Sequence, residues 1–227
     1  MFSIVVLSMR NAIARREEMA RKLQGVNLKY DFFDAVDGRK LEAGDFYNKS
    51  INSNFWFNRR KILTPSEVGC TLSHNEILKE FVSNSADEWL IVLEDDVDIK
   101  SNFSQVLHNF CSYNSDKPFN GVLILGGQEG LKSQHLIFKI KSKKYFNHPF
   151  YLIPSFFHKW VYRTCGYAIN KESAQKILDL KIKKNIVADD WSYIFKKTSL
   201  DKMYFTHLVV HPEDLSDSSI HNERIKK

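Results

Sequence analysis

Long apolar stretches are missing from this sequence. Nowhere do 18 apolar residues follow one another, so no membrane-spanning helix is predicted, and any contact with a bilayer is expected to be peripheral. The opening residues, MFSIVVLSMRN, contain one short apolar run with no basic segment before it. That pattern indicates a first strand and not a secretory signal. We therefore expect a cytoplasmic protein.

Cysteine is scarce and irregularly spaced. Cys70, Cys111 and Cys165 are odd in number and form no C-x-x-C or Cys/His zinc pattern, so we expect reduced, mostly buried thiols, as in cytoplasmic proteins. Motifs typical of nucleic-acid binding are also missing, and nucleic acid is not an expected partner. The net charge of +6 and the pI near 9.1 instead favour other anionic partners, such as a nucleotide diphosphate or an anionic lipid.

The sequence has enough apolar residues for a sizeable core. Its 227 residues are 43% hydrophobic and include 17 Phe, which fits a single domain over residues 1–227. Residues 2–7 and 28–33 are typical of strands, and they flank a charged amphipathic helix at 12–23. This β-α-β opening indicates an α/β fold.

Three adjacent carboxylates follow the most apolar strand. Residues 89–93 are typical of a strand buried on both faces, and Glu94, Asp95 and Asp96 come directly after it. Ligands of open α/β sheets bind at the carboxyl ends of strands, and crowded carboxylates repel one another. We therefore predict a site for Mg²⁺ or Mn²⁺, with a diphosphate completing the ligand shell. The alternative is that these acids form a turn and cap a following helix.

A strong helix start occurs at Thr64. Thr as the N-cap, Pro65 at the first helical position and Glu67 at the third form a capping box, and the helix is expected to reach about residue 83. On this helix, His74 falls on an otherwise apolar stripe. It is therefore expected to be either a satisfied inward-facing histidine or a residue of the site.

Two long segments lack a regular pattern. Residues 42–63 are polar and aromatic, and we expect a loop over the active edge of the sheet. Residues 139–162 mix lysines with aromatic side chains, including Trp160, a combination that frames sugar clefts or contacts lipid headgroups. The alternative for this basic-aromatic segment is a large loop packed on the domain.

Two dipeptides stand at the ends of expected elements. Gly126-Gly127 follows an expected strand and either lets a ligand approach the backbone closely or forms an ordinary turn. Asp189-Asp190 precedes Trp191 and a short expected helix. Helix capping explains one of these two acids but not obviously both, so the pair is a candidate for chemistry.

Seven segments follow one another in a recognisable order: IVVLSMRNAIARRE, YDFFDAVDG, PSEVGCTLSHNEIL, WLIVLEDDV, CGYAINKESAQKIL, NIVADDW and HPEDLSDSSI. LEDDV alone is weakly specific, whereas GCTLSH upstream of it with GYAINKESA downstream is strongly specific. In this order the segments resemble glycosyltransferase family 25, the lipooligosaccharide biosynthesis glycosyltransferases of Gram-negative bacteria. The resemblance spans nearly the whole chain.

The resemblance implies a fold and an activity. The fold is GT-A-type, a Rossmann-like nucleotide-sugar-binding domain with a mixed, mostly parallel central sheet, whose acidic motif holds a divalent metal against the donor diphosphate. The implied activity is transfer of galactose from UDP-galactose, with inversion and a β-1,4 linkage, to a lipooligosaccharide outer core. A lipid-linked oligosaccharide acceptor further implies peripheral contact with the cytoplasmic face of the inner membrane.

The chemistry of transfer and the resemblance together give the candidate residues their roles. An acceptor hydroxyl needs a carboxylate to take its proton, and Asp190, with Asp189 as second choice, is the expected base. The expected metal ligands are Asp96, Glu94, Asp95 and, by similarity to metal-dependent GT-A enzymes, a histidine near the C-terminus: His211 ahead of His207 and His221. The expected donor contacts are Ser8, Arg10, Asp37, Gly38, His74, Gly126 and Gly127. The expected acceptor contacts are Trp160 and Trp191.

The leading hypothesis is therefore a cytoplasmic, inverting, metal-dependent galactosyltransferase. One rival is transfer of another sugar, glucose or N-acetylglucosamine, by the same machinery. Another is a non-catalytic glycan- or lipid-binding protein on the same fold, against which the presence of both LEDDV and VADDW argues.

Overall fold

The computed structural model describes residues 1–54, 61–115, 117–145, 147–212, 214 and 218–225. Its helices are α1 (Ile13–Gly25), α2 (Ala43–Ser50), α3 (Pro65–Asn84), α4 (Phe103–Ser115), α5 (Lys171–Lys181), α6 (Trp191–Lys197) and α7 (Ser219–Ile225), with short 3-10 helices η1 (Gly38–Lys40), η2 (Lys132–Leu136) and η3 (Ser155–Trp160). Its strands are β1 (Phe2–Ser8), β2 (Asp31–Asp34), β3 (Trp89–Glu94), β4 (Asp98–Ile99), β5 (Gly121–Gly126), β6 (Ile140–Tyr145), β7 (His148–Leu152), β8 (Gly166–Asn170) and β9 (Lys202–Val210).

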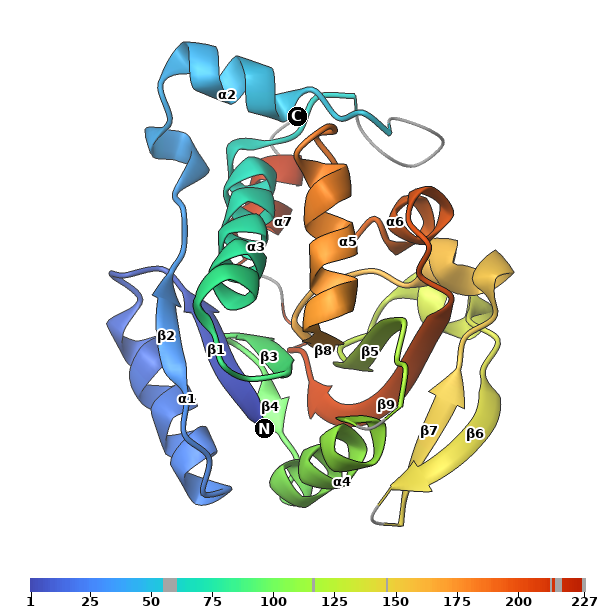
Figure 1. Ribbon diagram of the computed structural model, residues 1–227. Coiled ribbons are helices and arrows are strands. Elements are labelled where there is room, and N and C mark those ends of the chain that lie inside the picture. Colours follow the sequence, from blue (N-terminus) through green and yellow to red (C-terminus); the bar gives the residue numbers. More distant parts are fainter. Residues whose placement is uncertain (55–60, 116, 146, 213, 215–217, 226–227) are drawn as a thin grey trace.

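One sheet of nine strands runs through the described part of the chain (Figure 1). Its order is β2-β1-β3-β8-β5-β9-β7-β6, and β4 pairs with β9. The predicted mixed α/β sheet is confirmed, but the expected majority of parallel pairs is wrong. Among the described residues, β1·β2, β1·β3 and β5·β9 are parallel and five pairs are antiparallel. The cause is that β8 runs antiparallel between β3 and β5, and that the β6–β7 hairpin joins antiparallel to β9.

Helices cover both faces of this sheet, as the apolar sequence of β3 requires. Successive side chains of a strand point to opposite faces. Leu90 and Val92 accordingly pack in the cluster that contains α3, α5 and α6, whereas Trp89, Ile91 and Leu93 pack in the cluster that contains α1 and α4. Figure 1 shows these two groups of helices on opposite sides of the sheet. All five side chains are buried, so the strand is held firmly at the end that carries the acids.

The start of α3 is built as its sequence predicts. The hydroxyl of Thr64 accepts a hydrogen bond from the N–H of Glu67 at 3.3 Å, and the Glu67 carboxylate accepts one from the N–H of Thr64 at 2.8 Å. This reciprocal pair fixes the helix start. The preceding loop lies directly against it, because a Cβ on Gly38 would stand 1.9 Å from the carbonyl oxygen of Pro65. Only glycine fits at that position.

Regular structure occurs in one segment expected to be a loop and in another for which a large loop was the alternative. Residues 43–50 form α2, and the part of this expected loop at 55–60 lies outside the described residues. The basic-aromatic segment at 139–162 forms the β6–β7 hairpin and η3, not a large loop. In both cases pairing or packing with distant parts of the chain supplies order that local sequence does not show. Within the described ranges, no helix has the length and apolar character needed to cross a bilayer.

Candidate functional site

The carboxyl ends of β1, β3, β5 and β9 lie at one edge of the sheet, and polar side chains meet there. β3 ends at Glu94, β9 is followed by His211, and the antiparallel β8 begins at the same edge just after Thr164. A cavity of about 430 Å³ opens at this edge, and its lining includes these three residues together with Asp96 and Asp189. This is where open α/β sheets bind their ligands.

Glu94, Asp96 and His211 form a cluster of candidate metal ligands. One ligand atom from each lies within 4.8 Å of the others, and His211 Nε2 is 3.7 Å from Asp96 Oδ2. The other oxygen of Asp96, Oδ1, is buried and has no hydrogen-bond partner among the described residues. A divalent cation fits these oxygen and imidazole ligands, because it satisfies that oxygen and offsets the repulsion between the two carboxylates.

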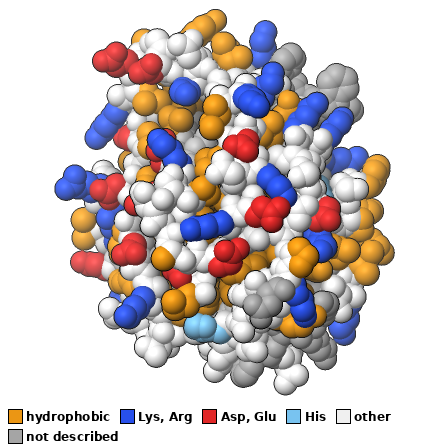
Figure 2. All heavy atoms as spheres, viewed as in Figure 1, with side chains coloured by type: hydrophobic (Ala, Val, Ile, Leu, Met, Phe, Trp, Pro, Cys, Tyr) orange, Lys and Arg blue, Asp and Glu red, His pale blue; other side chains and the backbone are white. Residues whose placement is uncertain are grey.

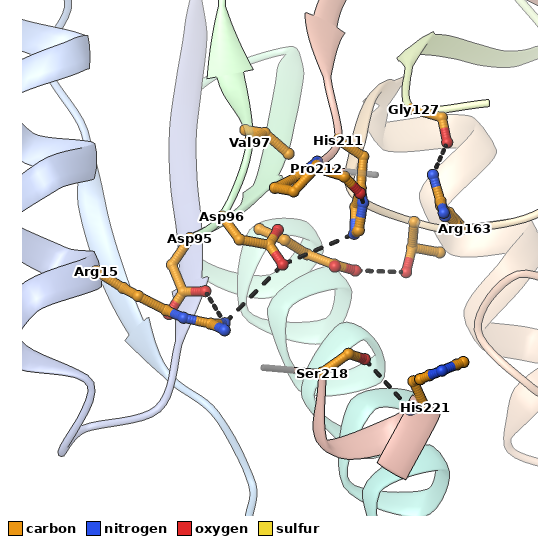
Figure 3. A network of polar contacts seen from close by, with 12 residues as sticks. Arg15, Asp95, Asp96, Val97, Gly127, Arg163, His211, Pro212, Ser218 and His221 are labelled. Carbon is orange, nitrogen blue, oxygen red and sulfur yellow. Dashed lines mark hydrogen bonds and ion pairs between the residues drawn. The ribbon is translucent and has the colours of Figure 1, made fainter. Parts of the chain in front are cut away.

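The ring of His211 is oriented for such a role. Its Nδ1 lies 2.7 Å from the carbonyl oxygen of Pro212. A carbonyl can only accept, so Nδ1–H donates to it, and this leaves Nε2 directed toward Asp96 (Figure 3), where it would be the nitrogen that binds a cation. Metal-binding histidines are commonly oriented by a backbone carbonyl in this way.

The two carboxylates of the cluster ionise differently. Burial, together with the negative charge of Glu94, raises the pKa of Asp96 above its ordinary value. Burial also opposes ionisation of Glu94, but the nearby imidazoles of His74 and His211 and the hydroxyl of Thr164 favour its charged form and hold the pKa of Glu94 below its ordinary value. The surroundings therefore favour ionisation of Glu94 and oppose that of Asp96, and a nearby cation would favour ionisation of Asp96 most.

Asp95 has a different role from its two neighbours. Its carboxylate accepts hydrogen bonds from the hydroxyl of Ser8 and, at 3.3 Å, from Arg15 Nη1. Figure 3 shows Asp95 pointing toward Arg15, while Asp96 points toward His211. Ser8 and Asp95, which were expected at the donor and the metal, thus satisfy each other and join β3 to β1 and α1. Their packing leaves Glu94 and Asp96 facing the cavity.

A polar network lies behind Glu94, on the side of α3. The hydroxyl of Thr164 donates to Glu94 Oε1 at 3.0 Å, and His74 Nε2 lies 3.8 Å from the same oxygen. His74 Nδ1 is 3.1 Å from the hydroxyl of Tyr167, and the histidine side chain is only 2% exposed. His74 therefore faces inward and lies beside a carboxylate of the site, and its expected contact with the donor stays a prediction.

Asp189 and Asp190 have different surroundings. Asp190 is 2% exposed and caps α6: its carboxylate accepts hydrogen bonds from the N–H of Tyr193 at 3.3 Å and from the side-chain amide of Asn54 at 2.6 Å. Asp189 lines the cavity and accepts a hydrogen bond from the N–H of Arg163 at 3.1 Å. Capping therefore accounts for Asp190, and Asp189 is the acid that faces the cavity, the reverse of the expected ranking.

None of the seven residues expected at the donor belongs to the described lining of the cavity, and three of them are held by local contacts. The Arg10 side chain is 89% exposed and lies 4.0 Å from a carboxylate oxygen of Asp34. Asp37 caps η1 and pairs with Arg39 at 2.7 Å, a hydrogen bond that lowers the pKa of Asp37. Gly38 packs on the start of α3. Local structure accounts for each of them without a ligand.

Gly126 and Gly127 are required by the packing of β5. Both have positive φ, at +149° and +77°. A Cβ would stand 1.9 Å from the carbonyl oxygen of Val209 at the first and 2.0 Å from Cys165 Sγ at the second. The atoms that approach these glycines closely are therefore those of neighbouring parts of the chain, where a ligand was one of the expected possibilities. The carbonyl oxygen of Gly127 also accepts a hydrogen bond from Arg163 Nη1 at 2.9 Å.

The two tryptophans expected at the acceptor lie in different environments. Trp191 is 2% exposed and packs edge-to-face on Tyr167 with ring centroids 5.8 Å apart, so it belongs to the core and offers no surface to an acceptor. Trp160 is partly exposed at the end of η3, with the Lys159 ammonium 5.3 Å from its ring. It stands two residues before Tyr162, which lines the cavity.

Several lining residues were not predicted from the sequence. They are Cys70, Arg163, Thr164 and, on and just before α7, Ser218, Ile220 and Arg224, whereas His221, a candidate metal histidine, also lines the cavity. Cys70 had a visible signal, since it precedes His74 by four positions on the same helix. The others had none: Arg163 adopts a positive φ of 67° in a loop, and α7 reaches the cavity because Arg224 donates to Glu67 at 2.6 Å and Glu223 accepts from Ser66.

Comparisons with known proteins give one family match and several relatives. The family model described as glycosyltransferase family 25 (LPS biosynthesis protein) matches residues 1–192. Procollagen galactosyltransferase 2 of Homo sapiens is 25% identical over 77% of this chain, and the procollagen lysyl hydroxylase and glycosyltransferase of Acanthamoeba polyphaga mimivirus is 27% identical over 77%. The matches take in only 27% and 18% of the lengths of these relatives.

A solved structure shares the fold. Residues 1–349 of S. aureus TarS give a TM-score of 0.52 at 12% sequence identity, covering 92% of this chain and 60% of that one. At this identity the likeness concerns the arrangement of strands and helices alone.

Proposed function

The chain belongs to glycosyltransferase family 25, and on that premise we propose that it is an inverting, metal-dependent galactosyltransferase. Its GT-A-type fold suits a sugar nucleotide bound at the carboxyl edge of the sheet. The proposed donor is UDP-galactose, and the proposed acceptor is a lipooligosaccharide outer core that receives the sugar in a β-1,4 linkage.

One observation carries this proposal: Glu94, Asp96 and His211 gather at the sheet edge, and Asp189 lines the same cavity. The first three fit a hard divalent cation, Mg²⁺ or Mn²⁺. Such a cation acts as a Lewis acid on the β-phosphate of a departing UDP. A second acid in the same cavity is what direct displacement at an anomeric carbon requires, because the attacking hydroxyl must lose its proton.

We assign the proton transfer to Asp189. Its Oδ2 is held by the N–H of Arg163 at 3.1 Å, and the Arg163 guanidinium is itself fixed by the carbonyl oxygens of Gly127 and Glu129 at 2.9 and 3.1 Å. This loop therefore holds the carboxylate in place. Attack from the side opposite the leaving UDP inverts the anomeric centre in a single step. Asp190, the base expected from the sequence, instead caps α6 and so helps to hold the neighbouring Asp189 in place.

The donor sugar is proposed on the strength of a relative's name. The human relative is a procollagen galactosyltransferase, which supports galactose. Transfer of glucose or N-acetylglucosamine by the same residues is the alternative within enzymes. A non-catalytic glycan-binding role is the alternative outside them, and it predicts no dependence on nucleotide or metal.

The deciding experiment is release of UDP from a panel of sugar nucleotides, measured with Mn²⁺ or with a chelator and with truncated lipooligosaccharides as acceptors. We expect metal-dependent turnover of UDP-galactose. Turnover of another donor would replace galactose in the proposal. Retained glycan binding without turnover of any donor would replace the enzyme by a binding protein.

The metal cluster has a matched control within the same segment. Asp96→Ala removes a proposed ligand, and we expect the Mn²⁺ dependence of UDP binding to be lost. Asp98→Ala removes a carboxylate two residues later, whose side chain is 72% exposed and pairs with Lys22 at 2.7 Å. This control should bind Mn²⁺ and UDP as the wild type does. An unchanged response to Mn²⁺ in Asp96→Ala would refute the ligand assignment.

The lipid-linked acceptor implies a membrane-facing surface, and we propose that it lies on η2, η3 and the chain around them. Four large apolar side chains are exposed there by 46 to 68%: Leu136, Phe138, Ile140 and Phe156. Lysines accompany them, and the Lys159 ammonium lies 4.2 Å from the ring of Phe156. Figure 2 shows hydrophobic and basic side chains together at the right of the molecule. This surface adjoins the cavity, because two residues that line the cavity flank the surface: Leu131 precedes η2 and Tyr162 follows η3.

Binding to vesicles tests this surface. We expect the protein to sediment with vesicles rich in anionic lipid, which imitate the proposed membrane surface, and to sediment less with zwitterionic vesicles. Phe156→Ser should weaken this binding, whereas Ile182→Ser, which changes an 80% exposed residue at the end of α5, should not. Equal binding by both variants would refute the surface.

A further inference from the structure

We propose that Cys70, His74 and Glu94 form a second divalent-cation site, suited to a thiophilic ion such as Zn²⁺. One ligand atom from each of these residues lies within 4.8 Å of the others. Sulfur, imidazole nitrogen and carboxylate oxygen together are typical of zinc, whereas the Glu94–Asp96–His211 cluster has no sulfur ligand. The two clusters lie side by side, because Glu94 belongs to both.

The state of His74 supports this site independently of the spacing. The side chain is 2% exposed, and its Nε2, which lies 3.8 Å from Glu94 Oε1, has no hydrogen-bond partner among the described residues. Buried polar atoms are rarely left without a partner. On the other side of the ring, Nδ1 is 3.1 Å from the Tyr167 hydroxyl. When Nδ1–H donates to that hydroxyl, the Nε2 lone pair is available to a cation.

Charge and access also suit a divalent ion here. A Cys70 thiolate and the Glu94 carboxylate together balance a charge of +2, as a buried position requires. Burial and the charge of Glu94 raise the pKa of the Cys70 thiol, so its proton passes to solvent only as the cation binds. Cys70 is only partly buried and lines the cavity at the sheet edge, so an ion can enter from there and keep a water as its fourth ligand.

The carboxylate of Glu94 is shared by the two clusters, so binding of an ion at one affects the other. A Zn²⁺ ion that engages Glu94 from the side of Cys70 takes that carboxylate from an ion held by Asp96 and His211. The two ions should therefore compete, although only one of the clusters contains sulfur. The binding of a thiophilic ion needs neither a sugar nucleotide nor an acceptor, so it is tested apart from the transfer reaction.

Cobalt spectroscopy gives a direct test, because Co²⁺ bound to a thiolate shows a near-ultraviolet charge-transfer band. We expect this band in the wild type, its removal by Zn²⁺, and its loss in Cys70→Ser. The matched control is Cys111→Ser, which changes a buried thiol on the opposite face of the sheet and should keep the band. A band that persists in Cys70→Ser, or no band in the wild type, would overturn the proposal.

A second variant leaves all three ligands in place. Tyr167→Phe removes only the hydroxyl that orients His74, and we expect Zn²⁺ binding to weaken by about 10- to 100-fold, the usual loss for such a partner. Unchanged affinity in this variant would mean that His74 is not a ligand. Competition is read from the electron paramagnetic resonance of free Mn²⁺: Zn²⁺ should release Mn²⁺ from the wild type more readily than from Cys70→Ser. If Mn²⁺ never binds, the first cluster fails as a metal site, while the cobalt result still decides the second.

Discussion

Replacing each acid of the Asp189-Asp190 pair by asparagine separates a chemical role from a structural one. Asp189→Asn keeps an oxygen that can accept from the N–H of Arg163 but cannot take a proton from a hydroxyl. Loss of a general base costs about 10²- to 10⁴-fold in rate, which corresponds to about 3 to 5 kcal/mol of transition-state stabilisation. The folded state should be affected little, because the acceptor oxygen remains.

The neighbouring substitutions should behave in the opposite way. Asparagine is as good an N-cap as aspartate, so Asp190→Asn should keep most of the activity. Asp190→Ala removes the cap on Tyr193, worth about 0.5 to 2 kcal/mol, and the charged hydrogen bond to Asn54, worth about 1.5 to 3 kcal/mol. We therefore expect Asp190→Ala to lose about 2 to 5 kcal/mol of unfolding free energy.

Two measurements on the same preparations decide between these roles: kcat for UDP-galactose and the free energy of unfolding in urea. The assignment of the base to Asp189 is refuted if Asp190→Asn loses turnover 100-fold while Asp189→Asn remains near the wild type. It is refuted equally if both asparagine variants lose turnover to the same extent without unfolding. Binding of UDP in the presence of Mn²⁺ should be retained in both, since neither acid belongs to the metal cluster.

Three further predictions concern packing, pH and metal. Gly127→Ala should lose about 2 to 5 kcal/mol of unfolding free energy in urea, because its Cβ meets Cys165 Sγ at 2.0 Å and its φ is +77°. In the control Gly25→Ala the new Cβ has no atom within 4 Å, so the unfolding free energy should change little. Burial opposes ionisation of Glu223, but hydrogen bonds from Ser66 lower its pKa. The Glu223 carboxylate therefore stabilises α7 above its pKa in the unfolded chain, and this stabilisation is lost as the pH falls through its pKa in the folded protein. Hydrogen exchange of α7 measured against pH should show this loss, and Glu223→Gln should remove the pH dependence. Chelation of divalent cations should stop UDP release, and added Mn²⁺ should restore it; release that continues with chelator would exclude the metal role.

Local sequence was sufficient for the elements that carry the site. Residues 89–93 are apolar throughout and formed a strand buried on both faces, and the capping box at Thr64 formed with both of its hydrogen bonds. Such signals are reliable because they depend on neighbours in the chain. The direction of β8 and the β6–β7 hairpin depend on pairing with distant strands, so the balance of parallel and antiparallel pairs was not predictable from local pattern.

The sequence by itself determined the family, the α/β class and the types of residue at the strand ends, because these follow from motif order and apolar periodicity. Only the tertiary structure decided which residues of each set act together. It turned Asp95 toward Ser8 and Arg15, and it brought His211 to Asp96 across more than a hundred residues of chain. The reason is physical: side-chain direction at a strand end depends on the partners that neighbouring strands supply, and those partners are distant in sequence.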